Sequence, residues 1–442
     1  MRIAVTGAAG QLGTVVLRRL AVERGVTGLR SLDLRPPAVA SGKLEHVRAD
    51  VRDPEFARFL QGCDALVHLA FIVTGAPPRD VFDAINVGGS KNAIAAAVSV
   101  GIKEIVYTSS VAAYGVVHGH PRPIVETTPR VHQPSFPYSA AKFAVEAWLD
   151  EFEPQHPDVA IARLRPSIVV GAPTVHAHGA MLARRAIVDV GAPMPLVWDE
   201  DVAEVVALAL RKNARGAYNV TSEPAATARE LADACDLRLI RIPRALINVG
   251  AQLGAWATRL GLSDAVDPAW LRISDVCMDM SAEKARRELG WKPKCPTPVA
   301  VIKRFLAENS SGLDRRLDLF VRLLQLAARR LVDDPSMHTR GRVHLRLTGP
   351  GGGDIGFILD GARLDVVREM PRPPTTVVTM KTATFYDLLA GRSDFNIAQM
   401  TGKLRVEGEA LNAFVVQAMV TRFRDTAPKR LQRLLVKGAS AS

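Results

Sequence analysis

Cysteine is scarce in this sequence of 442 residues, which contains only Cys63, Cys235, Cys277 and Cys295. These residues are scattered, and no two of them form a C-x-x-C pair. The sequence therefore predicts neither a zinc site nor a disulfide framework, and no other metal site is expected. Because reduced, unpaired thiols are typical of the cytosol, we expect a cytoplasmic protein.

Long apolar runs are also missing. No stretch of about 18 apolar residues without charges occurs, so no membrane-spanning helix is predicted. Residues 1–5 run directly into a glycine loop, and we therefore expect no signal peptide. Acidic residues are outnumbered, with 45 Asp and Glu against 57 Lys and Arg, which gives a formal net charge of +12. This excess favours phosphates or anionic membrane surfaces as partners, although an ordinary basic surface explains it equally well.

What the sequence does contain is an alternation of short apolar runs and helical patterns over residues 1–110. This alternation predicts βαβ units and a parallel sheet. The expected strands are Ile3–Thr6, Leu29–Leu34, Ala65–Ala70 and Glu104–Ser109, and the expected helices are Gln11–Arg24 and Val87–Val100. A mixed pattern continues to about residue 308 and ends with an expected helix over Ser281–Trp291.

Residues 309–312, Asn-Ser-Ser-Gly, have the composition of a linker. A long helical pattern follows over Leu313–Val332 with arginines among its apolar positions. We therefore predict two domains, residues 1–308 and residues 313–442, the second being a separate α+β domain. Its expected strands and later helices are Arg342–Leu347, Ile355–Leu359, Thr375–Lys381, Ala383–Ala390 and Ala410–Arg424.

Three glycines between the first strand and the first helix form the pattern G-x-x-G-x-x-G. Gly7 permits a tight turn, Gly10 lets the backbone approach a pyrophosphate, and Gly13 lets the helix pack closely. The N–H groups at the start of the helix then face the anion. The predicted dinucleotide loop comprises Thr6, Gly7, Ala9, Gly10, Gln11, Leu12 and Gly13.

Acidic residues follow the next two strands. Asp33 lies 20 residues after Gly13, a spacing at which a carboxylate accepts hydrogen bonds from ribose hydroxyls, so NAD is favoured. Arg35 keeps NADP open as an alternative, because an arginine there could pair with a ribose phosphate. Further cofactor contacts are expected from Asp50 and Val51 near the adenine and from Leu69 and Ala70 after the fourth strand, whereas His68 is expected to be a hydrogen-bonded core residue.

Tyr138 and Lys142 stand four residues apart, so they share one face of a helix. A lysine ammonium beside a phenol favours the phenolate, and we therefore expect a lowered tyrosine pKa. The tyrosine could then exchange a proton with a substrate hydroxyl or carbonyl while hydride moves to or from nicotinamide. A hydroxyl within Thr108–Ser110, at the end of a predicted strand, could hold the substrate oxygen.

In motif and order these features resemble the extended short-chain dehydrogenase/reductase family, which includes nucleotide-sugar epimerases and dehydratases and the 3β-hydroxysteroid dehydrogenases. The resemblance covers about residues 1–306. It implies an α/β Rossmann fold, a doubly wound parallel sheet with helices on both faces, that binds NAD. Further matching segments are Asn86–Gly89, Ser109–Gly115, Arg165–Gly171, Asp199–Leu208 and Gly216–Val220.

The same resemblance implies roles for single residues. Tyr138 is expected to be the acid/base, and Lys142 its activator and a contact of the cofactor ribose. Ser110 is expected to bind the substrate oxygen, with Ser109 as the alternative. Pro166 is expected near the nicotinamide, and Tyr114 in packing or in the wall of a pocket.

The C-terminal region has its own recurrent order. A helix and a glycine-containing loop over Thr384–Arg392 are followed by a G-K-x-x-x-x-G strand within Met400–Glu409. Residues from about 313 onward thereby resemble the sterol-carrier-protein family of lipid-transfer domains. The resemblance implies an α+β layer around an apolar tunnel for fatty-acyl chains or sterols. An ordinary hydrophobic core explains the same apolar stripes.

Three functions remain open on these grounds. The first is an NAD-dependent oxidoreductase acting on a hydroxyl or ketone of a lipophilic, sterol-like or acyl substrate, which the C-terminal domain concentrates. The apolar segment Ile242–Leu262 could wall its pocket or be an ordinary buried helix. The second is a nucleotide-sugar epimerase or dehydratase, with Arg184, Arg185 and Arg241 as candidates for binding a diphosphate. The third is a binding protein without turnover, which the Ser–Tyr–Lys set disfavours.

The expected partners follow from these functions. They are a lipophilic small molecule in the N-terminal domain, a lipid in the C-terminal domain and a second copy of the chain in a homodimer. Peripheral membrane contact through the basic helix Leu313–Val332 is a further expectation, although packing onto either domain would also use its apolar stripe. No nucleic acid partner is expected.

Overall fold

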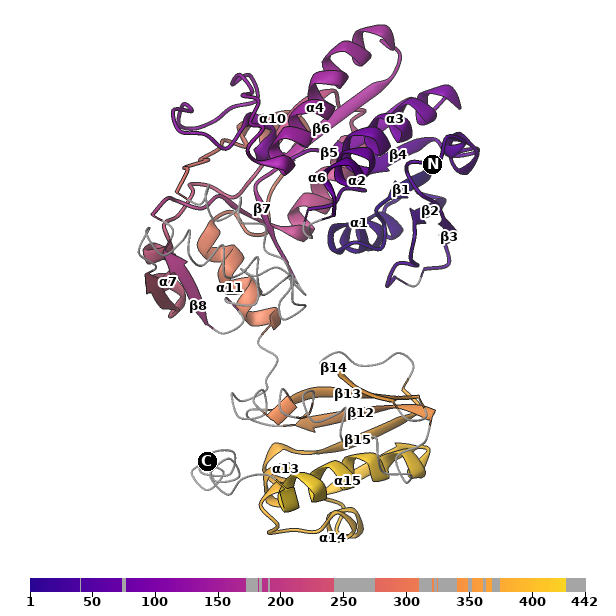
Figure 1. Ribbon diagram of the computed structural model, residues 1–442, viewed down its shortest axis with the longest axis vertical. Coiled ribbons are helices and arrows are strands. Elements are labelled where there is room, and N and C mark those ends of the chain that lie inside the picture. Colours follow the sequence, from indigo (N-terminus) through magenta and orange to yellow (C-terminus); the bar gives the residue numbers. More distant parts are fainter. Residues whose placement is uncertain are drawn as a thin grey trace. The chain divides into compact units, whose positions relative to one another are not determined.

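The computed structural model describes residues 1–39, 41–73, 77–171, 182, 185–189, 191–241, 275–309, 320–321, 324, 340–348, 352–360, 363–367 and 374–426. The chain forms two compact units, Met1–Asn309 and Ser310–Ser442 (Figure 1). Several sequence expectations lie outside the described residues. They are residues 310–312 of the linker, most of Leu313–Val332, the segment Ile242–Leu262, and Arg184.

The first unit contains a sheet of seven parallel strands. Each strand pairs in parallel with its neighbours, as the alternation of strands and helices predicts. The order across the sheet is β3 (Leu44–Arg48), β2 (Gly28–Asp33), β1 (Arg2–Thr6), β4 (Ala65–His68), β5 (Glu104–Thr108), β6 (Ala160–Pro166) and β10 (Gly216–Val220).

Helices cover both faces of this sheet. Ile3 and Val5 of β1 are buried with residues of α1 (Gln11–Ala21) and α6 (Asp199–Arg211). Ala4, between them, is buried in a second cluster with residues of α3 (Gly89–Ser99) and α4 (Pro137–Phe152). Successive side chains of a strand point to opposite faces, so the two clusters lie on opposite sides. The doubly wound α/β fold is confirmed.

A smaller apolar cluster joins the later elements of this unit. Its members include Trp198, Leu231 and Phe305, all buried. Two short parallel ladders, β7 with β9 and β8 with β11, lie outside the main sheet. The elements are β7 (Ile168–Val170), β8 (Ala186–Asp189), β9 (Leu196–Trp198), α7 (Ala228–Cys235), β11 (Arg238–Arg241), α10 (Glu283–Leu289) and α11 (Pro298–Asn309), with one-turn 3₁₀ helices η1 (Phe56–Phe59), η3 (Val111–Tyr114) and η4 (Glu153–Gln155).

The helix expected at Val87–Val100 begins earlier than predicted. It consists of α2 (Arg79–Asp83), a π-helical turn η2 (Ala84–Gly88) and α3. Asn86 within the π turn accepts a hydrogen bond from the Ile72 N–H at 2.7 Å and donates one to the Ile72 carbonyl at 3.0 Å. Such turns are frequent at functional sites. Here the turn directs a buried carboxamide toward the chain that follows β4.

The second unit is a five-stranded mixed sheet with helices. The order is β14 (Arg363–Val367), β13 (Gly353–Asp360), β12 (Arg340–Thr348), β15 (Thr376–Lys381) and β16 (Leu404–Gly408). Among the described strands of this sheet, only β12 and β15 pair in parallel. Helices α13 (Thr382–Leu389) and α15 (Ala410–Thr426) lie along the sheet, with α14 (Phe395–Met400) beyond them (Figure 1). This α+β architecture agrees with the sequence, which missed β14 and α14. No described helix is long and apolar enough to cross a membrane.

Candidate functional site

The carboxyl ends of the parallel strands lie together at one edge of the first unit. Thr6 at the end of β1 pairs with Leu32 of β2 and with His68 of β4. Thr108 at the end of β5 pairs with Leu164 of β6. The loops that follow these strands therefore come together, and they carry the predicted cofactor and catalytic residues. Ligands of doubly wound folds bind in a crevice at this edge of the sheet.

At each of the three glycine positions of the dinucleotide loop, a different physical reason favours glycine. Gly7 has φ +64°, and a Cβ on it would lie 2.6 Å from the Ala70 nitrogen. A Cβ on Gly13 would lie 2.3 Å from the Gly7 carbonyl oxygen, so the start of α1 packs against the loop itself. Gly10 is different, because a Cβ on it would meet only the Gly7 oxygen, at 3.1 Å. The backbone at Gly10 is therefore open to a close-lying ligand.

Asp33, at the end of β2, contacts this loop. Its Oδ2 accepts a hydrogen bond from the Ala9 N–H at 3.0 Å, and its Oδ1 accepts one from the Arg35 N–H at 3.1 Å. Both bonds fix the carboxylate beside the predicted dinucleotide loop. The Arg35 side chain is exposed. The structure thus brings Asp33 and the loop together, as the sequence expects.

Asp50 and Val51 follow β3 and differ in their surroundings. The Arg52 guanidinium binds Asp50, with Nη2 2.6 Å from Oδ2, and this hydrogen bond lowers the pKa of Asp50 despite partial burial. Val51 is buried, and its Cγ2 would be 2.5 Å from a Cβ placed on Gly89. An adenine amino group at this place would share the Asp50 carboxylate with Arg52.

Thr6 ties the end of β1 to the segment after β4. Its Oγ1 accepts hydrogen bonds from the N–H groups of Leu69 at 3.2 Å and Ala70 at 3.3 Å. It also lies 2.8 Å from His68 Nδ1, while His68 Nε2 lies 3.0 Å from Ser90 Oγ. Burial, together with the nearby Lys142 charge, lowers the pKa of His68 to about 3. His68 is therefore a neutral, hydrogen-bonded core residue, in agreement with the sequence.

The structure brings Tyr138 and Ser110 together. Tyr138 lies in the first turn of α4, and its side chain is hydrogen-bonded to Ser110. Ser109 is turned away, since its hydroxyl donates to Glu146 Oε1 at 2.5 Å in a buried bond. Of the two serines left open by the sequence, Ser110 is the one that meets the tyrosine. Tyr114 is fully buried, and its hydroxyl donates to Asn219 Oδ1 at 2.8 Å, so it packs.

Lys142 lies one turn further along α4 and is 2% exposed. Its Nζ donates to the Thr108 carbonyl at 2.7 Å and lies 3.5 Å from the centre of the Phe71 ring. The same nitrogen is 5.9 Å from the centre of the Tyr138 ring. Burial lowers the pKa of Lys142 well below its usual range, and the negative charge of Glu146 opposes this shift.

The expectation of a lowered Tyr138 pKa is wrong for this structure. Burial raises the pKa of Tyr138 to about 12, and the hydrogen bond with Ser110 lowers it only in part. The sequence pattern places Lys142 on the correct helix face but does not show that its ammonium binds Thr108 rather than the phenol. Desolvation disfavours the charged form of both groups.

The site residues fit a dinucleotide. Gly10 offers an open backbone between strand and helix, and Asp33 offers a carboxylate at the next strand. Two buried hydroxyl oxygens at the strand ends, Thr108 Oγ1 and Ser167 Oγ, have no hydrogen-bond partner among the described residues. Ser167 directly follows Pro166, the buried last residue of β6. Unpaired buried polar atoms at a strand edge are suited to a polar ligand.

Two residues near this site were not found from the sequence. They are Phe71, which lies under Lys142, and Glu146, which binds Ser109. A signal existed for Glu146, which lies four residues after Lys142 and eight after Tyr138 on the same helix face. No spacing rule indicated Phe71.

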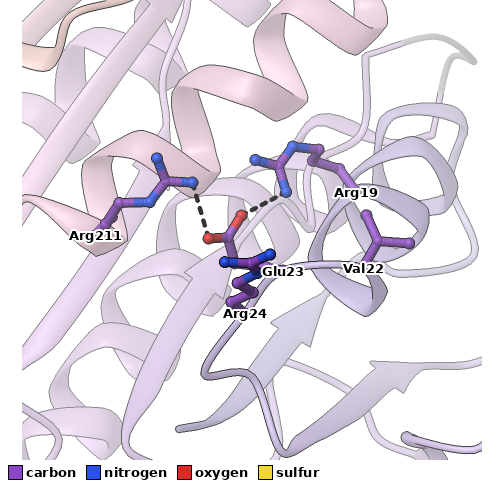
Figure 2. A pocket seen from close by; sticks show the side chains of 5 residues that line it. All are labelled: Arg19, Val22, Glu23, Arg24 and Arg211. Atoms are coloured by element: carbon purple, nitrogen blue, oxygen red, sulfur yellow. Dashed lines mark hydrogen bonds and ion pairs between the residues drawn. The ribbon is translucent and has the colours of Figure 1, made fainter.

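A surface recess lies at the ends of α1 and α6. Figure 2 shows that the carboxylate of Glu23 stands between Arg19 and Arg211, to which it is joined at 2.6 and 2.8 Å. The recess is also lined by Val22 and Arg24. Because its carboxylate is already matched by two guanidinium groups, this recess is a structural ion-pair cluster and not the candidate site.

Family comparisons agree with this geometry. Residues 3–221 match the NAD dependent epimerase/dehydratase family, and residues 322–421 match the SCP-2 sterol transfer family. The chain therefore joins a region of the NAD dependent epimerase/dehydratase family to a region of the SCP-2 sterol transfer family. The first region is an enzyme of this NAD-dependent kind, and NAD is its cofactor.

Individual relatives cover different shares of the chain. The uncharacterized protein y4nG of Sinorhizobium fredii is 28% identical over 318 residues, which are 68% of this chain and 77% of that protein. The UDP-glucose 4-epimerase of Mycolicibacterium smegmatis is 34% identical over 190 residues, 40% of this chain and 59% of that enzyme. The 3β-hydroxysteroid dehydrogenase/Δ5→4-isomerase of Monkeypox virus is 32% identical over 126 residues, 27% of this chain and 36% of that enzyme. The chain thus spans less than two thirds of these two enzymes.

Solved structures show the same fold. The crystal structure of gox2253 superposes with a TM-score of 0.54 at 27% identity and covers 69% of this chain and 96% of that chain. The dTDP-glucose 4,6-dehydratase DesIV from Streptomyces venezuelae, solved with NAD bound, superposes with a TM-score of 0.54 at 22% identity. This superposition covers 70% of this chain and 98% of the dehydratase.

Proposed function

We propose that the N-terminal unit is an oxidoreductase that acts on a hydroxyl or ketone group of a lipophilic, sterol-like or acyl substrate. The observation that carries the proposal is the hydrogen-bonded pair of Tyr138 and Ser110 at the strand edge, beside a dinucleotide loop and on the same chain as an SCP-2 region. A 3β-hydroxysteroid dehydrogenase among the relatives supports the substrate class. Residues 1–308 and 313–442 are the proposed domains.

The proposed roles follow from the hydrogen bonds. NAD, when bound, supplies the hydride acceptor, and its reduced form supplies the donor. With a pKa of about 12, the Tyr138 phenol is protonated at neutral pH and is set to donate its proton to a ketone oxygen. Ser110 holds the same oxygen through its hydroxyl. Lys142 contacts the ribose and keeps the end of β5 in place through the Thr108 carbonyl.

The proposed cofactor contacts are those at the strand edge. The backbone at Gly10 and the start of α1 would hold the pyrophosphate, and Asp33 the adenine ribose. The complete proposed set is Thr6, Gly7, Ala9, Gly10, Gln11, Leu12, Gly13, Asp33, Asp50, Val51, Leu69, Ala70, Tyr138, Lys142 and Pro166.

The second unit would hold the lipid. It has its own apolar core, in which Phe357, Phe385 and Met419 are almost fully buried. Tethering a lipid-binding domain to an enzyme raises the effective concentration of its ligand toward the millimolar range. The proposed substrate is accordingly one that the second unit can bind and the first can oxidise or reduce.

A nucleotide-sugar epimerase or dehydratase is the second candidate, favoured by the UDP-glucose 4-epimerase among the relatives. The arginines proposed for its diphosphate give weaker support. Arg185 is engaged with Asp236, and its Nη2 also donates to the Cys235 carbonyl. Arg241 ends β11 and is exposed.

The discriminating experiment is a substrate screen with the full-length protein. NAD reduction is followed at 340 nm with sterols, long-chain alcohols and nucleotide sugars, and NADH oxidation with the corresponding ketones. We expect turnover with an apolar alcohol or ketone. Activity confined to nucleotide sugars would contradict the proposal and establish the second candidate.

We expect Asp33→Ala to weaken NADH binding by about 10- to 100-fold, since a hydrogen bond to a carboxylate is worth about 1.5–3 kcal/mol. NADPH binding should weaken less, because the lost carboxylate repels its ribose phosphate. Fluorescence titration with both cofactors measures the difference. Asp33→Asn is the control, because its amide oxygen can still accept the Ala9 hydrogen bond. Equal losses for NADH and NADPH would contradict the assignment of Asp33 to the ribose.

Residues 313–442, expressed alone, should fold and bind apolar ligands. The reason is that the buried cluster of this unit is formed by its own residues. Circular dichroism tests folding, and titration with a fluorescent acyl chain or sterol tests binding, with residues 1–308 as the control protein. A folded fragment without affinity for either probe would make it a structural module and remove the main support for a lipophilic substrate.

A further inference from the structure

One face of α4 meets three consecutive residues at the end of β5. The residues of α4 lie at steps of four, and the proposed function uses only the first two. The contacts are Tyr138 with Ser110, Lys142 Nζ with the Thr108 carbonyl at 2.7 Å, and Glu146 Oε1 with the Ser109 hydroxyl at 2.5 Å. Glu146 is therefore part of the same contact as the proposed catalytic pair.

Glu146 is an unusual residue for this place because its side chain is completely buried. Arg165 binds it twice, with Nε–Oε1 at 2.9 Å and Nη2–Oε2 at 2.5 Å. Arg130 adds a third contact, with Nη1 3.4 Å from Oε2. Desolvation of a charged pair costs free energy, so a buried carboxylate of this kind is weak evidence for stability alone. A function in the site accounts for its position better.

We propose that Glu146 is a positioning residue of this site, which holds the Ser109 hydroxyl against α4 and places a buried negative charge one helical turn from Lys142. Arg165, which fixes the carboxylate, directly precedes Pro166 at the end of β6. One buried ion pair therefore connects the serine loop with the predicted nicotinamide segment. This inference rests on the proposed function, because it assumes that Lys142 contacts the cofactor.

The charges around Lys142 agree with this role. From α4 it faces Glu146 and Tyr138, from β5 Tyr107 and from β4 His68, while Phe71 covers its nitrogen. Tyr107, Tyr138 and His68 are neutral near pH 7, since burial raises the pKa of both phenols and lowers that of the imidazole. Burial lowers the pKa of Lys142, and the negative charge of Glu146 opposes this lowering. Arg165, Arg163 and Arg130 lie against that carboxylate and weaken its field.

The test is the pH dependence of NADH binding, followed by NADH fluorescence between pH 6 and 10. Wild-type affinity should fall on the alkaline side as Lys142 loses its proton, and Lys142→Ala should remove this fall. In Glu146→Gln the fall should move to lower pH by about one unit, the usual scale for losing a nearby opposite charge. Between the two midpoints NADH affinity should therefore differ by up to about tenfold.

Two control variants separate the effect of the Glu146 charge from general damage. Glu153→Gln removes the same charge from the same arginine cluster, since Glu153 binds Arg163 at 2.7 Å, and it should leave the profile unchanged. Ser109→Ala removes one hydrogen bond of Glu146 but keeps its charge, so the midpoint should stay in place. If Glu146→Gln does not fold, the double variant Glu146→Met with Arg165→Met removes the charge without an unpaired buried ion and should shift the midpoint in the same direction.

The outcomes are distinct. A shifted midpoint in Glu146→Gln, or in the double variant, with an unchanged Glu153→Gln supports the inference. Equal midpoints in the wild type and Glu146→Gln overturn it while leaving the proposed function intact. If the wild-type affinity shows no alkaline fall, or if Lys142→Ala retains the fall, Lys142 does not hold the cofactor. Either outcome contradicts both the proposed function and this inference.

Discussion

Tyr138→Phe should remove nearly all turnover and leave NADH affinity almost unchanged. The phenol is the group placed to exchange a proton with the substrate oxygen, and losing a general acid–base group costs on the order of 10²–10⁴ in rate. The cofactor, by contrast, is expected to be held mainly by the glycine loop and Asp33. The measurements are kcat with the substrate identified by screening and NADH affinity by fluorescence.

Tyr114→Phe is the matched control for this variant. Tyr114 is also buried in the same unit, but its hydroxyl is used in packing, where it lies 2.8 Å from the acceptor Asn219 Oδ1 and 3.1 Å from the Val125 carbonyl oxygen. We expect Tyr114→Phe to lose some stability, whereas kcat of the folded protein should be unchanged. Near-wild-type turnover by Tyr138→Phe would refute the acid–base role and with it the proposed mechanism.

Asp199→Asn should increase the free energy of unfolding at alkaline pH. This gain over the wild type should become smaller as the pH falls. Asp199 is 2% exposed, and burial, reinforced by Glu200 and Glu308, raises its pKa from 3.8 to about 7. The folded state thus binds more protons than the unfolded state between about pH 4 and pH 7. The contribution of Asp199 to the free energy of unfolding therefore decreases as pH rises through this window and is constant above it.

The expected size follows from the shift of about three pKa units, at about 1.4 kcal/mol each. The free energy of unfolding of Asp199→Asn minus that of the wild type should rise by about 4 kcal/mol from pH 4 to pH 8. Urea unfolding at several pH values measures it. Groups that do not interact with Asp199 cancel in the difference. A flat difference would show that folding does not raise the pKa of this carboxyl.

The neighbouring variant Glu200→Gln tests the sign. Although burial raises the pKa of Glu200, its hydrogen bond with Lys294 and the charge of Arg304 lower it overall. Its contribution to stability is therefore present above the unfolded pKa and lost in acid. The corresponding difference for Glu200→Gln should decrease with pH, opposite to the trend for Asp199→Asn.

The fold could be predicted where the pattern is long or repeated. Apolar runs predicted the bounds of β1, β2, β4 and β5 to within one or two residues, because buried parallel strands are apolar on both faces. β14 was missed because Arg363 and Asp365 interrupt a strand of five residues at the sheet edge. α14, with six residues, is too short to show a helical period.

The candidate site was predictable where one local spacing defines the chemistry. The glycine loop and the pair Tyr138 and Lys142 depend on neighbours in the sequence, and the structure places them at one strand edge. Phe71 depends on strand order, which no local pattern encodes. The direction of the Tyr138 pKa shift was predicted wrongly for the same reason. The burial of a phenol is a property of the packed fold and cannot be read from a local pattern.

The carboxamide of Asn86 has a consequence for how the chain can vary. By bonding both the N–H and the C=O of Ile72, it replaces the neighbouring strand that this segment lacks after β4. Phe71, whose ring covers Lys142, directly precedes Ile72, so a residue of the π-helical turn helps to locate this ring. A substitution of Asn86 should therefore also disturb the ring over Lys142, so position 86 can vary less freely than other polar positions of a helix.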